Sequence, residues 1–259
     1  METHIVTHKK IKPNKPVLIV GLPGIGNVGK LVAEHLKREF KAQRFATLYS
    51  PHFPHQVQML KNGGVRLVSN RFYLIRDKRF KNDIMLLTGE TQAVSPEGQF
   101  EVNEKIVDFF KKLNGMFVYT LGGYNTELRP QENPQVYGNV TRKEVIKQFD
   151  GTGIIFGKSR GTILGSAGLI IAFAKMAKMD GICIMGETAY PNFDPRAAKV
   201  VLEALSKALG VKIDTKHLDK IIDRTAKAIK DIEKQAGLVI PQFGEPVPTI
   251  PPESPSYIR

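Results

Sequence analysis

The segment between Gly21 and Gly29 holds the pattern with the clearest chemical potential. Gly24, Gly26 and Gly29 have the G-x-G-x-x-G spacing of a dinucleotide-binding turn, in which the amide groups of a following helix face a pyrophosphate. Such a site also needs an acid at the end of the second strand, and none is present there. Pro23 removes one amide donor from the turn. We therefore predict a structural or interface turn without a cofactor, with nucleoside or nucleotide binding as the alternative.

Two carboxylates follow apolar, strand-like runs. Glu90 follows Leu87-Thr88-Gly89, and Glu187 follows Met185-Gly186. Two carboxylates at the ends of neighbouring strands could work as an acid/base pair. They could equally cap helices or line a pocket that has no activity, and the sequence leaves these alternatives open.

Other candidate catalytic or metal-binding residues lack partners at the necessary spacing. His52 and His55 form a His-x-x-His pair, but no cysteine or carboxylate follows at a metal-ligand spacing. Ser159 has the G-x-S-x-G spacing of a nucleophile elbow, which requires an acid and then a histidine downstream. Only His217 follows, in a segment typical of a surface helix. We predict no catalytic residue and no metal site.

The composition is that of a folded and strongly basic chain. Hydrophobic residues make up 42% of the 259 residues, and the net charge is +13. The densest basic runs, residues 8–15 and 76–81, come without a recognisable nucleic-acid-reading motif. We predict a basic solvated surface and expect no nucleic-acid partner, although an acidic protein face or a nucleic acid remain alternatives. Cys183, the only cysteine, lies in an apolar run and is predicted to be a buried free thiol.

No apolar run reaches the ~18 residues that span a bilayer. The first 15 residues are polar and lack the apolar core of a signal peptide. We expect a cytoplasmic protein without a membrane partner.

Hydrophobic periodicity predicts alternating strands and helices. Ser95 is a predicted N-cap, with Pro96 at the first helical position. A hairpin is predicted from residues 65–69 and 71–76, and a long loop from 125–139. We predict strands at 17–20, 44–49, 65–69, 71–76, 84–88, 116–121, 153–156 and 182–185, and helices at 28–40, 95–113, 141–149, 162–178, 195–209 and 214–235. This order predicts one α/β domain over residues 1–236, a three-layer αβα sandwich around a mostly parallel sheet with one hairpin edge.

After residue 236 the composition changes to that of an extended tail. Six prolines fall between residues 241 and 255, and there is little apolar surface to bury. The segment ends with Ser256, Tyr257, Ile258 and Arg259. An apolar tip on a flexible arm can act as a tethered ligand, so these four residues are the predicted partner-binding site.

Five short motifs follow one another along the chain. They begin at Gly21 (G-x-P-G-x-G-x-V-G), Leu87 (L-T-G-E), Leu121 (L-G-G-Y), Gly165 (G-S-A-G-L) and Met185 (M-G-E-T). In this order they resemble the archaeal type of the proteasome assembly chaperone family, and the resemblance spans roughly residues 16 to 209, about three quarters of the chain.

The resemblance implies a fold like that of purine nucleoside phosphorylases without their catalytic residues. It also implies a non-catalytic homo-oligomer that binds proteasome α-subunits or related proteins. Some archaeal relatives end in a hydrophobic–tyrosine–any tripeptide that docks between α-subunits. In this chain Tyr257 stands one place earlier than that pattern requires.

Overall fold

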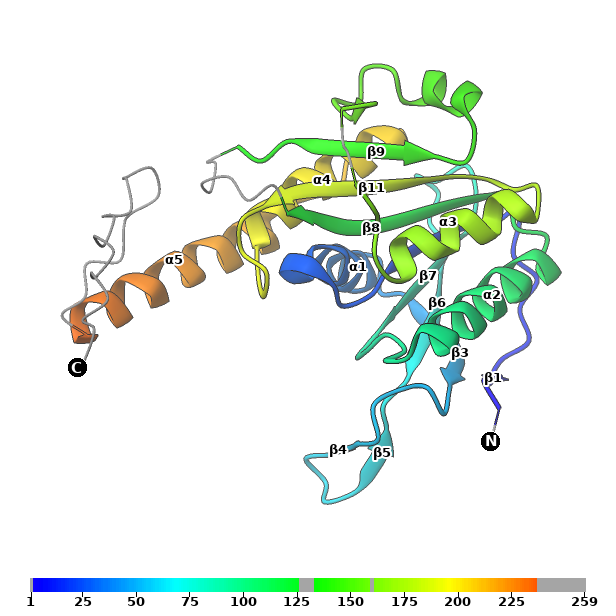
Figure 1. Ribbon diagram of the computed structural model, residues 1–259, viewed down its shortest axis with the longest axis horizontal. Coiled ribbons are helices and arrows are strands. Elements are labelled where there is room, and N and C mark those ends of the chain that lie inside the picture. The colour runs from blue at the N-terminus through cyan, green and yellow to red at the C-terminus, as the bar shows by residue number, and fades with distance from the viewer. Residues whose placement is uncertain (1, 126–132, 159–160, 237–259) are drawn as a thin grey trace, which may run out of the picture.

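A computed structural model describes residues 2–125, 133–158 and 161–236 of the chain. Its centre is a nine-stranded sheet with the order β1-β3-β6-β7-β2-β8-β11-β9-β10 (Figure 1). The strands are His4–Thr7 (β1), Val17–Gly21 (β2), Gln43–Tyr49 (β3), Asn70–Ile75 (β6), Ile84–Gly89 (β7), Phe117–Asn125 (β8), Val136–Val140 (β9), Ile155–Phe156 (β10) and Asp180–Thr188 (β11).

The sheet is mixed, so the prediction of a mostly parallel sheet is wrong. The central strands β7, β2, β8 and β11 are parallel to their neighbours in this group. The pairs β1–β3, β3–β6, β6–β7 and β11–β9 are antiparallel. The segment that joins β6 to β7, residues 76–83, is too short for a parallel crossover, which needs a dozen or more residues.

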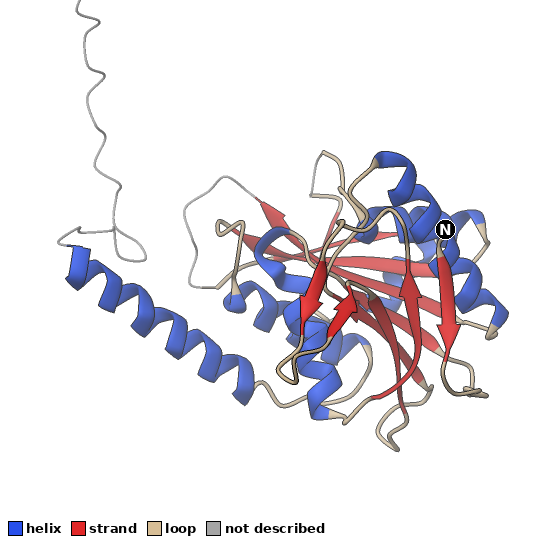
Figure 2. Ribbon diagram, turned by 90° about the horizontal axis from the view of Figure 1, so that it is seen from below, coloured by secondary structure: helices blue, strands red, loops and turns tan. Residues whose placement is uncertain are grey.

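Helices cover both faces of the sheet (Figures 1 and 2). On one face, α1 (Val28–Glu39) and α4 (Pro195–Ala208) contribute to one buried apolar cluster. On the other face, α2 (Pro96–Lys112) and α3 (Ser166–Met176) contribute to a second cluster. The predicted α/β class and its helix–sheet–helix layering are therefore confirmed.

The helix α5 (Lys216–Ala236) contacts α4 and then leads away from the sheet (Figures 1 and 2). Leu218 in its first turn is fully buried. Two short 3-10 helices, η1 (Ile25–Asn27) and η2 (Lys143–Phe149), complete the described helical elements. None of the helices in the described part of the chain is long and apolar enough to cross a membrane.

The start of α2 is as predicted from the sequence. The Ser95 hydroxyl oxygen accepts a hydrogen bond from the Gly98 amide at 3.0 Å, and Pro96 occupies the first helical position. This bond satisfies one of the amide groups that a helix leaves without an internal partner at its start.

The hairpin predicted from residues 65–76 is wrong. Val65–Leu67 (β5) pairs instead with Val57–Met59 (β4) in a separate two-stranded sheet. β6 belongs to the main sheet, where Asn70 is buried opposite Gly89. A side-chain carbon on Gly89 would lie 1.9 Å from the Asn70 Oδ1 atom, so the two strands approach closely because Gly89 has none.

The loop predicted for residues 125–139 is also partly wrong, because β9 begins at Val136 and pairs with β11. Residues 126–132 lie outside the described part. β1 was not predicted at all, and it pairs with β3 at one edge of the sheet.

Candidate functional site at the carboxyl ends of the parallel strands

A cavity of about 500 Å³ lies where β2, β8 and β11 end. This is the edge at which open α/β sheets commonly bind ligands. The glycine-rich turn forms one wall, and the segment before α3 forms another. None of the described lining residues carries a charge at neutral pH. They are Val20, Leu22, Gly24, Ile25, Gly29, Gln92, Gln99, Leu121, Gly122, Gly123, Tyr124, Asn125, Thr162, Ile163, Leu164, Gly165, Ser166, Ala167 and Met185.

Gln92 occupies the position in this cavity that would suit an anion. Its Oε1 atom accepts a hydrogen bond from the amide of Ser166, the first residue of α3, at 2.8 Å. Its Nε2 atom donates to the Pro23 carbonyl at 2.5 Å. Amide groups at helix starts attract phosphate because they carry partial positive charge. Here a neutral side chain of the protein itself satisfies that amide.

The glycine-rich turn is closed by internal hydrogen bonds. The Gly26 amide donates to the Pro191 carbonyl at 2.7 Å, and the Asn27 amide donates to the Gly24 carbonyl at 2.9 Å. Gly26 has a φ of 62°, which glycine adopts without strain. The Gly26 amide therefore holds the turn against the segment before α4, the Asn27 amide closes the turn on itself, and neither is directed at a phosphate site.

Two further glycines of the motif allow close packing of α1 on the sheet. A side-chain carbon on Gly29 would lie 2.2 Å from the Leu121 carbonyl oxygen in β8. One on Gly21 would lie 2.1 Å from the Gly29 carbonyl oxygen. Close backbone contact between the helix and two strands thus requires glycine at positions 21 and 29. The interpretation as a structural turn accounts for three of its glycines.

Glu90 and Glu187 do not form a pair. β7, which Glu90 follows, and β11, which contains Glu187, are three strand spacings apart in the sheet, about 14 Å. The Glu90 carboxylate contacts Arg71 at 2.7 Å and Arg66 at 3.1 Å. Glu187 is buried and accepts a hydrogen bond from the Gln135 amide at 3.0 Å. Both carboxylates join neighbouring chain segments, and neither lines the cavity.

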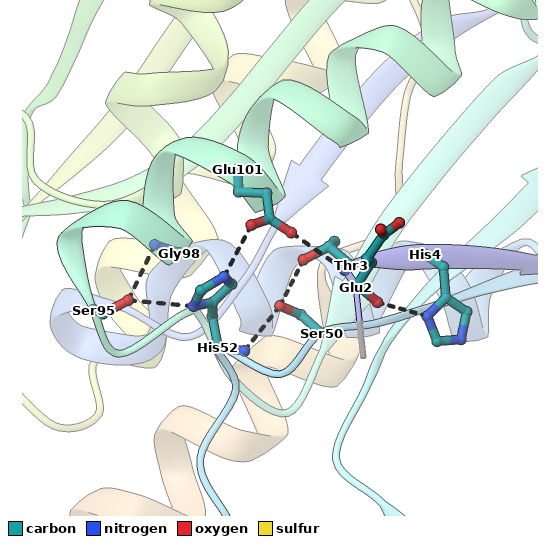
Figure 3. A network of polar contacts seen from close by, with 8 residues as sticks. All are labelled: Glu2, Thr3, His4, Ser50, His52, Ser95, Gly98 and Glu101. Carbon is teal, nitrogen blue, oxygen red and sulfur yellow. Dashed lines mark hydrogen bonds and ion pairs between the residues drawn. The ribbon is translucent and has the colours of Figure 1, made fainter.

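His52 belongs to a network that joins the N-terminal segment to α2 (Figure 3). Its Nε2 atom lies 2.9 Å from Glu101 Oε2, and its Nδ1 atom lies 3.4 Å from Ser95 Oγ. The Glu101 carboxylate also accepts a hydrogen bond from the Thr3 amide at 3.2 Å. Hydrogen bonds from Thr3 and then from His52 lower the pKa of Glu101.

A serine, a histidine and a carboxylate in succession resemble a catalytic triad by residue type only. The Ser95 oxygen already accepts the capping hydrogen bond from Gly98, and none of these side chains lines the cavity. The geometry is that of a structural network in which His52 contacts Ser95 and Glu101. His55 is exposed on the same loop. Within residues 2–125, 133–158 and 161–236, no three His, Cys, Asp or Glu side chains gather as a metal site requires.

The remaining candidates have simpler surroundings. Cys183 is a fully buried free thiol, as predicted, and burial raises the pKa of its thiol to about 11. His217 lies in the first turn of α5, with its ring centroid 6.1 Å from that of His35. Ser159 lies outside the described residues, as do Ser256, Tyr257, Ile258 and Arg259 of the predicted partner-binding site.

Sequence reasoning missed an apolar surface on the small β4–β5 sheet. Val57, Met59, Val65 and Leu67 are all exposed there. The signal was present as two short alternating runs around Asn62-Gly63-Gly64, a typical hairpin turn composition.

Comparison with known proteins gives a consistent assignment. The profile of the PAC2 family matches residues 18–233. Uncharacterized protein MJ1210 of Methanocaldococcus jannaschii is 39% identical over 230 residues, which cover 87% of this chain and 88% of that protein.

Two crystal structures from Pyrococcus furiosus are also similar. PbaB, an archaeal proteasome activator, is 38% identical with a TM-score of 0.83, covering 90% of this chain and 99% of PbaB. PbaA, an archaeal homolog of proteasome-assembly chaperone, is 25% identical in its monoclinic form with a TM-score of 0.76, covering 92% of this chain and 94% of PbaA.

Proposed function

Because the chain belongs to the PAC2 family, we propose that it is a non-catalytic, homo-oligomeric cytoplasmic protein that binds proteasome α-subunits or a related protein complex. The observation that carries this proposal is the similarity to PbaB over 90% of this chain and 99% of that one. The likeness to PbaA supports the same class of partner.

The cavity is consistent with a binding protein. It has no charged lining residue among those described, and an acid/base reaction needs groups that can exchange a proton near neutral pH. The two carboxylates that could have supplied them are engaged elsewhere, Glu90 with two arginines and Glu187 with the Gln135 amide.

The alternative, a nucleoside- or nucleotide-binding enzyme, is favoured by one observation. The cavity lies at the edge of the sheet where such ligands bind in related architectures. Against it, Gln92 satisfies the first amide of α3, and the glycine turn directs two of its amides inward. A nucleoside at a hundredfold excess over its dissociation constant should stabilise such an enzyme by about 2.7 kcal/mol, whereas we expect no shift in the unfolding midpoint.

We propose further that Ser256, Tyr257, Ile258 and Arg259 dock on the partner. The proline-rich composition after residue 236 favours an extended arm. Several arms on one oligomer would raise avidity by 10²–10⁴ without new contacts, as an order of magnitude.

The experiment is size-exclusion chromatography with light scattering on mixtures with archaeal proteasome core particle. We would compare the full chain, a chain ending at Leu238, and the full-length variant Tyr257→Ser/Ile258→Ser. We expect the full chain to co-elute with the core particle and both altered chains to lose co-elution while keeping their oligomeric mass. Tyr190→Ser, far from the tail in sequence, serves as a control for loss of a tyrosine. Undiminished co-elution of the truncated chain would refute docking through the tail.

A further inference from the structure

The β4–β5 hairpin has one apolar face that is largely exposed. Its cross-strand pairs alternate between two faces. The pairs Val57–Leu67 and Met59–Val65 lie on one face, and the pair Gln58–Arg66 lies on the other. The exposed fractions of the apolar residues are 52% for Val57, 89% for Met59, 65% for Val65 and 49% for Leu67.

The polarity of this hairpin is the reverse of the usual one. A sheet with one solvated face normally turns its apolar side chains to the core. Here Arg66, on the polar face, reaches toward the body of the protein and donates a hydrogen bond to Glu90 at 3.1 Å. It shares a groove with Arg44, Arg71 and Tyr73 of the main sheet. The apolar face therefore points away from the protein, and the hairpin projects from the sheet (Figures 1 and 2).

Nothing in the described part of the chain covers this face. Phe53 and Val68, which flank the hairpin, are buried, but the strands themselves belong to a sheet of only two. An isolated two-stranded hairpin is marginal in water and gains stability when its apolar face packs against something. A contiguous exposed apolar patch of this kind marks an interaction surface.

The charge distribution is compatible with a second copy of the chain as the occupant. With a net charge of +13, two copies repel each other wherever their cations meet. Between Val57 and Leu67 the sequence contains only two charged residues, Lys61 and Arg66. Arg66 is ion-paired with Glu90. The hairpin thus combines exposed apolar surface with low net charge, which is what contact between like-charged copies requires.

The area is also compatible with a pair of copies. Four exposed apolar side chains and their strand backbone present several hundred Å² in each copy. Packing the same face of two copies doubles this to roughly 1,000 Å², the lower limit for a specific interface.

We propose that the apolar face of β4–β5 packs against the same face of a second copy. The two ribbons form a small sandwich about a two-fold axis, and Met59 of each copy lies near its centre. The inference rests on the homo-oligomer of the proposed function and names its contact surface. Docking of the C-terminal tail is a separate property.

The first test compares two methionines of similar exposure in the full chain. Met59→Glu places a charge in the proposed interface, whereas Met176→Glu changes a methionine on α3 that is also largely exposed, at 76%. Sedimentation velocity across a concentration series should show that Met59→Glu raises the dissociation constant of the assembly at least about a hundredfold. Met176→Glu should assemble like the unaltered chain. An unchanged circular dichroism spectrum verifies that Met59→Glu folds.

The second test uses the burial of Cys183, which leaves an introduced surface thiol as the accessible one. Oxidation of Met59→Cys should give a disulfide-linked dimer, and Met176→Cys should not. The proposal is overturned if the unaltered chain is monomeric at every concentration, if Met59→Glu assembles normally, or if an oligomer forms without cross-linking at position 59. A monomeric chain that loses core-particle binding through Met59→Glu would show that a different protein occupies this face.

The hairpin contact and the docking of the tail can be refuted independently of each other. A monomeric Met59→Glu variant that still co-elutes with core particle would support both the hairpin contact and tail docking. A truncated chain that keeps its oligomeric mass but not its partner would confirm that the hairpin, and not the tail, joins the copies.

Discussion

Gly29 lets the first turn of α1 approach β8 as closely as backbone atoms allow. The carbon that any other residue would add lies 2.2 Å from the Leu121 carbonyl oxygen, and backbone cannot move aside as a flexible side chain can. Gly24, in the same motif, is in an extended conformation, and an added carbon there would meet only Gln92 at 3.7 Å. Packing of α1 on the sheet therefore requires glycine at position 29 but not at position 24.

We expect Gly29→Ala to lower the free energy of unfolding by about 1–3 kcal/mol, the usual cost of overpacking. This loss outweighs the gain of up to about 1 kcal/mol that alanine gives over glycine within a helix. Gly24→Ala should change stability by less than about 0.5 kcal/mol. Urea unfolding followed by circular dichroism measures both. Equal stability of the two variants would contradict the packing explanation of the motif.

The Ser95 cap sets where α2 begins and connects this helix to the loop that carries His52. Ser95→Ala removes the acceptor for the Gly98 amide and should cost about 1 kcal/mol of stability. Ser95→Asp retains a capping oxygen and should restore most of it. Thermal unfolding distinguishes the three chains. If Asp destabilises the protein as much as Ala does, the hydroxyl contributes through the His52 contact and not through the cap.

Elements whose signals are local were predictable from the sequence. The start of α2 follows from Ser95-Pro96, and the four central strands follow from short apolar runs. β9 was not predictable in this way, because its apolar content is modest and it is fixed by pairing with β11, about 45 residues further along the chain. The hairpin was wrong because the apolar runs of β5 and β6 are adjacent in sequence but belong to different sheets.

The candidate site, too, was predictable only in its local features. The position of the glycine turn, after a strand and before a helix, was predictable. Its role depends on contacts with residues far away in the sequence. Gly29 packs against the Leu121 carbonyl, and the first amide of α3 donates to Gln92, 74 residues earlier. These contacts form only in the folded chain and cannot be deduced from local sequence patterns. The reversed polarity of β4–β5 was likewise not predictable, because it depends on the contact between Arg66 and Glu90.

Across the whole molecule, the positive charge is concentrated where the fold brings the two densest basic runs together. The Arg76 guanidinium donates to the Lys12 carbonyl at 2.8 Å, and the Asn82 amide group donates to the Lys15 carbonyl at 2.7 Å. A recess of about 220 Å³ beside these contacts is lined by five cations and, among the described residues, by no carboxylate. The cations are Lys9, Lys10, Lys12, Arg44 and Arg76, of which Arg76 is ion-paired with Asp83 outside the recess.

This arrangement predicts that salt stabilises the protein. Screening of like charges should raise the unfolding midpoint as sodium chloride increases from about 0.01 M to 0.15 M, over which the Debye length falls from about 30 Å to 8 Å. Lys10→Glu/Lys12→Glu should raise the midpoint at low salt by roughly 1–3 °C, corresponding to surface charge effects of 0.2–1 kcal/mol, and should weaken its dependence on salt.

The matched control is Lys220→Glu/Lys227→Glu, which makes the same charge change on α5. Asp223 and Asp231 follow these lysines at helical spacings of three and four residues. Reversing the two charges replaces their attraction to the aspartates by repulsion, so the unfolding midpoint at low salt should stay the same or fall. If both double variants were stabilised equally, the total charge of +13 would be responsible, and the gathering of the two basic runs would have no separate effect on stability.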